Sequence, residues 1–307
     1  MRIRSIFVGG NGLRAGWRLA IFIVIAKLGG NLFLSILLRL GYKTHHGWHP
    51  LDFLVSDGLG FVALLIAALV MAWIERRRVG SYGLPAKGMF GARFWQGIAW
   101  GAGSVAVLAM AMVAGGGLRI SGLALHGRSL IGFALAWAVT MIVLGLFEES
   151  LFRGYPQITL ASGMGFWSAA VLLSLAFGAL HYFTKPHETL VDATSVALIG
   201  LFLCFTLKRT GNIWFAVGYH AAFDYVALIV LASPNTGMGT GGERVVGHLL
   251  TTTFPGPAWI TGGACGMEAS LFIFPILLAS FALFHHLYPP QRATAEGRVE
   301  AAASVRS

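Results

Sequence analysis

Long apolar stretches alternate with short polar connections along most of the chain. Stretches close to the length of about 20 residues that a membrane-spanning helix needs fall at roughly 17–40, 52–74, 94–114, 130–152, 164–184, 190–207, 212–232 and 268–288. The first of them contains Lys27, Asn31 and the pair Gly29-Gly30, which predict a kink or a face turned toward other protein. The pattern predicts an all-α membrane protein, a polytopic helical bundle of about eight transmembrane helices.

The composition agrees with a membrane protein. The 307 residues are 56% hydrophobic and 11% charged, whereas a soluble domain carries nearer a quarter charged residues. The net charge of +10 is also consistent with a nucleic-acid-binding protein. However, the basic residues lie at the ends of apolar runs, which is typical of membrane orientation. We therefore expect the lipid bilayer as a partner and no nucleic acid.

The basic residues also predict how the chain is oriented. Lys and Arg concentrate on the segments that share a side with the N-terminus, with Arg76, Arg77 and Arg78 as the densest group. Cytoplasmic connections carry the excess of positive charge in membrane proteins. The sequence therefore predicts an integral protein of the cell (plasma) membrane with both termini cytoplasmic, and an even number of spans agrees with this.

Charged residues interrupt the apolar pattern after the fourth stretch. From Leu130 to Phe147 there is no charged residue, and then Glu148, Glu149 and Arg153 follow within six positions. On a helix Glu149 and Arg153 are spaced i,i+4 in the favourable order, which predicts an ion pair. Glu148 lies about 100° around the helix from Glu149 and lacks that partner. An unpaired carboxylate at membrane depth predicts a functional site.

Three further polar residues lie within apolar stretches. His181 ends one stretch, while His220 and Asp224 are spaced i,i+4 and so share one helical face. Any one of these groups could be a structural contact between helices. Together with Glu148 they supply a base, hydrogen-bond donors and a set of metal ligands, which favours a site.

The connection 41–51 holds His45, His46 and His49. Three clustered imidazoles could bind a metal. Connections next to membranes also carry amphipathic rings as interface residues, and that interpretation is favoured here.

The residues that carry chemistry resemble the three motifs of one family. These motifs read Glu148-Glu149-x-x-x-Arg153, Phe177-x-x-x-His181 and His220-x-x-x-Asp224. They look like those of the CAAX-protease and bacteriocin-processing family, also called type II CAAX prenyl endopeptidases or the Abi family. The segment 209–224 is similar to the family's third-motif context. The resemblance divides the chain into N-terminal transmembrane helices (1–129), a CAAX-protease-like catalytic core (130–230), and a Gly-rich loop, last transmembrane helix and cytoplasmic tail (231–307).

The resemblance implies an intramembrane endopeptidase that acts on a peptide or a lipidated, CAAX-type protein substrate. Glu148 would be the general base and would share the attacking water with His181. His220 and Asp224 would stabilise the oxyanion; the family allows Asn or Asp at the last position, so a donor there requires a protonated Asp224. The ion pair of Glu149 with Arg153 would brace the helix.

A metal mechanism stays open at the same atoms. Glu148, His181 and His220 with an open fourth position would suit catalytic zinc, so zinc is an uncertain cofactor. The sequence contains no HExxH, and the string beginning at His187 lacks the second His. The family has been described both as metalloproteases and as glutamate-dependent enzymes.

Two other functions compete with the protease. Intramembrane acids and histidines also serve proton-coupled transporters, but those predict repeated halves that this sequence does not show. A catalytically silent membrane scaffold or immunity protein of the same fold is the second alternative, and the intact motif set argues against it.

One geometric conflict remains in this prediction. His181 lies about 17 residues, or roughly 25 Å, from the start of its stretch near Met164. With the fourth span ending at 152, Glu148 would lie close to the opposite side of the membrane. For the two residues to meet, the fifth stretch must start deeper in the membrane, tilt or break, or the predicted boundaries are wrong.

Overall fold

A computed structural model describes residues 7–9, 12–236 and 244–290. The predicted tail beyond 290 and part of the Gly-rich loop lie outside these ranges. The main helices are α2 (Ala15–Arg39), α3 (Pro50–Ile74), α4 (Ala92–Ala114), α5 (Gly127–Phe152), α6 (Tyr155–Met164), α7 (Phe166–Thr184), α8 (Leu190–Thr210), α9 (Trp214–Asp224) and α11 (Ile273–Leu287). The π-helix η2 (Tyr225–Val230) continues α9.

The prediction of an all-α polytopic membrane bundle is confirmed. Each of the eight predicted apolar stretches contains a helix in the structure. Within the described ranges, 6 helical segments are long and apolar enough to cross a membrane. Two shorter apolar segments, Trp214–Val230 and Ile273–Leu287, complete the set. The last predicted stretch began too early, because residues 268–272 precede α11.

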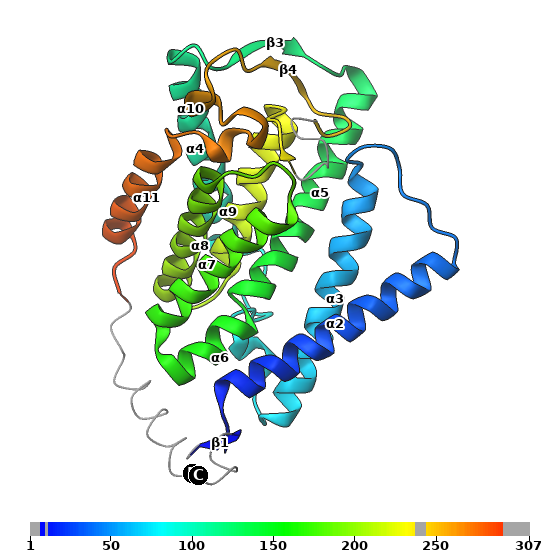
Figure 1. Cartoon of the computed structure of the whole chain (residues 1–307), viewed down its shortest axis with the longest axis vertical. Helices are drawn as coiled ribbons and strands as arrows, with labels where there is room; N and C mark the ends of the chain where they lie inside the picture. Colours follow the sequence, from blue (N-terminus) through cyan, green and yellow to red (C-terminus); the bar gives the residue numbers. More distant parts are fainter. Residues whose placement is uncertain (1–6, 10–11, 237–243, 291–307) are drawn as a thin grey trace.

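The helices run between two ends of the molecule (Figure 1). Strand β1 (Val8–Gly9), paired with β2 (Gly12–Leu13), lies at one end, and the ribbon of β3 (Arg119–Leu123) and β4 (Leu250–Thr253) lies at the other. Helix α2 crosses the neighbouring helices obliquely. The ribbon pairs Arg119 with Thr253 and Leu123 with Leu250. It ties the α4–α5 connection to the long connection before α11.

The sequence predicted the end of the fourth stretch at residue 152 correctly, but it did not predict the helix that follows. Helix α5 ends at Phe152, but α6 begins at Tyr155 and carries the apolar path on to Met164. Pro156 is tolerated in the first turn of α6, because backbone N–H groups there have no hydrogen-bond partner within the helix. Counted from the turn at Gly165, Glu148 and His181 are each about 16–17 residues away, or roughly 25 Å. The conflict in depth therefore disappears.

Glycines bring α4 and α9 into backbone contact. A Cβ atom at Gly97 would lie 2.1 Å from Phe215 O, and one at Gly101 would lie 2.2 Å from Tyr219 O. A Cβ at Gly218 of α9 would likewise lie 2.1 Å from an α4 carbonyl oxygen. Small residues spaced by four allow such close approach between membrane helices. This packing fixes the position of α9, the helix that carries the third motif.

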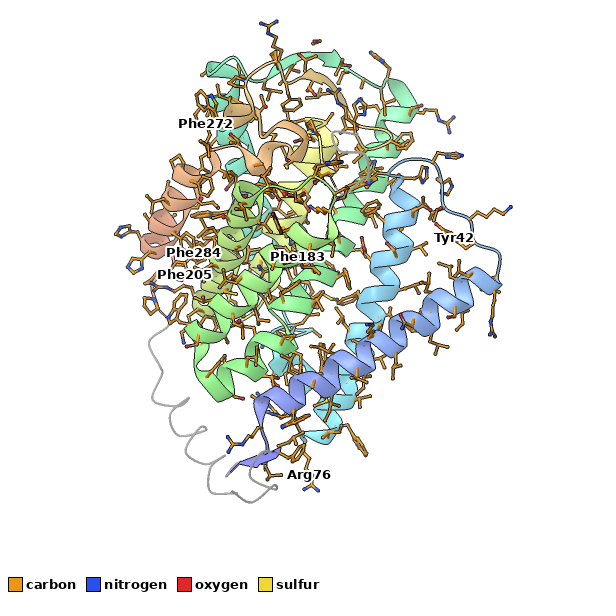
Figure 2. All side chains as sticks on the ribbon, viewed as in Figure 1. Tyr42, Arg76, Phe183, Phe205, Phe272 and Phe284 are labelled. Carbon is orange, nitrogen blue, oxygen red and sulfur yellow. The ribbon has the colours of Figure 1, made fainter. Side chains whose placement is uncertain are left out.

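An aromatic cluster attaches α11 to the bundle. Phe205 of α8 and Phe284 of α11 lie side by side with ring centroids 5.6 Å apart (Figure 2). Phe284 also contacts Phe215 of α9 at 5.0 Å and Trp100 of α4 at 5.4 Å. Offset and edge-to-face ring pairs stabilise packing beyond the buried area alone. The short α11 is therefore held against α4, α8 and α9.

Candidate functional site

The adjacent acids of α5 point to different surroundings. The Glu149 side chain is 0% exposed, and its Oε1 accepts a hydrogen bond from Arg153 Nη1 at 2.9 Å. The Arg153 side chain is 1% exposed, and its guanidinium lies over the Phe177 ring at 4.7 Å. Glu148 is 22% exposed. The i,i+4 spacing thus produces a buried ion pair, while Glu148 faces open space.

Glu149 also contacts α9, which the sequence did not predict. Its Oε1 lies 2.8 Å from His220 Nδ1, which donates to it. Helices α5 and α9 approach closely here, since a Cβ at Gly145 would lie 3.0 Å from Val217 O. One buried carboxylate therefore positions both Arg153 and the His220 ring.

The other nitrogen of His220 faces two more acids. His220 Nε2 lies 3.6 Å from Glu148 Oε2 and 3.4 Å from Asp224 Oδ2. The spacing of His220 and Asp224 places both on one face of α9, as the i,i+4 pattern predicts. The imidazole is thus surrounded by three carboxylates. In its imidazolium form it donates from both nitrogens, which satisfies this arrangement.

His181 is oriented by its own helix. Its Nδ1 lies 3.0 Å from Phe177 O, and because a carbonyl oxygen only accepts, Nδ1 carries the proton. In the neutral imidazole Nε2 is then free to accept a hydrogen bond. The Phe177 ring packs edge-on against His181 with centroids 4.6 Å apart. The second motif therefore sets both the direction and the tautomer of His181.

The four residues predicted to be catalytic line a single cavity of about 340 Å³: Glu148, His181, His220 and Asp224. Much of the remaining wall is apolar and includes Phe53, Met141, Leu144, Phe177 and Leu228. A cavity of mostly apolar walls with a few convergent polar groups is the usual form of a binding or active site.

The third motif lies in a segment that matches a known family. Residues 130–226 match the family model for Rce1-like proteins, described as Type II CAAX prenyl endopeptidase Rce1-like. The chain carries an Rce1-like domain. The resemblance to the CAAX-protease and bacteriocin-processing family is therefore confirmed. The domain begins within α5 and ends two residues after Asp224, so it contains all four residues above. No curated protein and no solved structure matches the chain significantly.

Four polar residues that line the cavity were not predicted, and they lie outside the three motifs: Thr184, Lys185, Asn235 and Glu268. Lys185 is one helical turn beyond His181, so its spacing was a usable signal. Burial raises the pKa of Glu268. Burial opposes the charge on Lys185, but nearby acids, with Glu268 first, hold its pKa above its ordinary value. The cavity wall therefore holds an acidic and a basic side chain that interact.

The site does not fit a zinc ion as arranged. Among the described residues, one group of three His, Cys, Asp or Glu donors converges within 4.8 Å, and it contains neither Glu148 nor His181 nor His220. Since Nδ1 of His220 donates to Glu149, Nε2 alone is left as a ligand atom on this residue.

Proposed function

We propose that the chain is an intramembrane endopeptidase that hydrolyses peptide bonds of membrane-associated or prenylated, CAAX-type protein substrates. The observation that carries this proposal is the cavity in which an Rce1-like domain brings Glu148, His181, His220 and Asp224 together. In this proposal residues 130–230 are the catalytic core, flanked by the N-terminal helices (1–129) and by the segment 231–307.

The reaction is glutamate-dependent in this proposal. Glu148 takes a proton from a water molecule in the cavity, and the water oxygen attacks the scissile carbonyl carbon. The free Nε2 of His181 accepts the water's other hydrogen and so orients it. Glu148 then transfers its proton to the leaving amine nitrogen as the carbon–nitrogen bond breaks.

His220 and Asp224 stabilise the negative charge that develops on the carbonyl oxygen. His220 Nε2–H is a donor, and Asp224 donates when it is protonated. Glu149 holds Nδ1 of His220 at 2.8 Å, so the donating nitrogen keeps its direction during the reaction. Arg153 balances the charge of Glu149 from within the bundle.

The test compares two Glu→Gln changes. Glu148→Gln keeps the size of the side chain but cannot take a proton, so turnover should fall at least about a hundredfold. Its thermal stability should change little, because the side chain faces a cavity. Glu75→Gln is the matched control, since Glu75 pairs with Arg18 and Tyr155 away from the cavity. It should lower stability and leave the turnover of folded protein unchanged.

Substrates are found by comparing the proteomes of membranes that contain wild-type or Glu148→Gln protein, and turnover is then measured with the purified protein. His181→Ala should lose turnover in the same way. Retained turnover in Glu148→Gln would refute the assignment of this residue as the base. A loss of stability as large as that of Glu75→Gln would favour a structural role instead.

A further inference from the structure

The connection between α2 and α3 gathers three metal-binding side chains far along the chain from the catalytic motifs. His45, His49 and Asp52 each offer one donor atom, and these atoms all lie within 4.8 Å of one another. The rings of His45 and His49 stack with centroids 4.1 Å apart and planes 16° apart. Such stacking points both imidazoles in similar directions. The sequence pattern had favoured interface residues here, and it did not include Asp52.

The carboxylate of this group is held in place by its neighbours. Asp52 Oδ1 accepts from the Tyr42 hydroxyl at 2.6 Å, and Oδ2 accepts from the His45 backbone N–H at 2.9 Å. His45 Nδ1 lies 3.0 Å from Asp52 Oδ1. Tyr42 lies in the connection just after α2 (Figure 2). The Asp52 carboxylate and the His45 ring are therefore held next to each other.

We propose that His45, His49 and Asp52 bind a divalent transition-metal ion of the zinc class at this connection. Two imidazoles and a carboxylate with an open fourth position suit zinc, whereas calcium and magnesium prefer oxygen ligands alone. A hydrogen bond competes with the ion for His49, because its Nδ1 accepts the Leu51 N–H at 3.3 Å. That hydrogen bond is long, and the ion replaces it.

The ion would act on the cavity through the residues next to its ligands. Trp48 precedes His49 and Phe53 follows Asp52, and both of these aromatic side chains line the cavity. The Trp48 carbonyl oxygen also accepts a hydrogen bond from Val246 N at 2.9 Å. Fixing His45, His49 and Asp52 therefore fixes two parts of the cavity wall. The bound ion stabilises the connection and holds the mouth of the cavity in one arrangement.

The experiment uses full-length protein in detergent after treatment with a chelator. Zinc is added, and bound zinc per chain and the melting temperature are measured. Wild-type protein should bind one zinc ion at this site and melt at a higher temperature. His45→Ala should lose at least about tenfold in zinc affinity together with the shift in melting temperature. His46→Ala is the matched control, because this adjacent exposed histidine is not part of the group, and it should behave as wild type.

Several outcomes would overturn the proposal. Zinc binding by His45→Ala with unchanged affinity would place the metal elsewhere, and an equal loss in His46→Ala would indicate unspecific binding by exposed imidazoles. Stabilisation by magnesium in place of zinc would refute the class of ion. Should His45→Ala fold poorly without metal, His45→Gln keeps a polar group toward Asp52 and remains a poor zinc ligand. The zinc titration of His45→Gln then decides the proposal.

Discussion

The substitution Glu149→Gln tests the buried ion pair between Glu149 and Arg153. It removes the charge of a side chain that is 0% exposed and leaves the guanidinium of Arg153, which is 1% exposed, without its counter-charge. Removing one partner of a buried ion pair costs about 3–5 kcal/mol. At 2–4 °C per kcal/mol this corresponds to a fall in melting temperature of roughly 6–20 °C. The amide oxygen of Gln can still accept from His220, so the change isolates the pair with Arg153.

The assay is thermal unfolding in one detergent for Glu149→Gln, Arg153→Met and the double variant. Because an uncharged pair of similar volume is often as stable as a buried ion pair, the double variant should recover part of the loss. Glu148→Gln is the control at the next position and should change the melting temperature far less, since that side chain is 22% exposed. A double variant whose loss equals the sum of the single losses would refute the pairing.

Two further predictions follow from the packing and from the charge bias. Gly101→Ala should lower both melting temperature and turnover, because its Cβ would lie 2.2 Å from Tyr219 O and would push α9 away from α4. Gly103→Ala is the control and should leave both unchanged, since its Cβ would have nothing within 4 Å. Equal effects of the two substitutions would contradict the argument. A cysteine at Arg77 should react with a membrane-impermeant thiol reagent only in permeabilised cells, whereas one at His126 should react in intact cells.

The apolar pattern was sufficient to predict the bundle and every main helix except α6. It did not predict α6, because Gly154 and Pro156 are typical of a stop, whereas here the chain bends and a second helix begins at Tyr155. Pairing of β3 with β4 joins segments more than a hundred residues apart, and neither strand is long enough to produce a pattern of its own.

The predicted site depended on spacing along single helices. Spacing predicted the pair of Glu149 with Arg153 and the shared face of His220 and Asp224. The contact between Glu149 and His220 depends instead on how α5 is rotated against α9, which sequence periodicity does not specify. Glu268 was missed for a different reason, since it lies in a 3-10 turn before α11 and was counted within an apolar span.

The position of the cavity connects the topology to the class of substrate. Trp48, Lys185 and Glu268 line it, and they lie in connections at the end of the molecule that carries the β3–β4 ribbon. If both termini are cytoplasmic, as the charge bias predicts, that end faces the outer side of the membrane. A prenylated protein anchored at the inner leaflet would not reach such a cavity, whereas the leader or anchor peptide of an exported protein would. If the labelling experiment showed Arg77 outside, the cavity would open to the cytoplasm and a prenylated CAAX-type substrate would be favoured. The orientation of the chain therefore decides which substrates should be tested first.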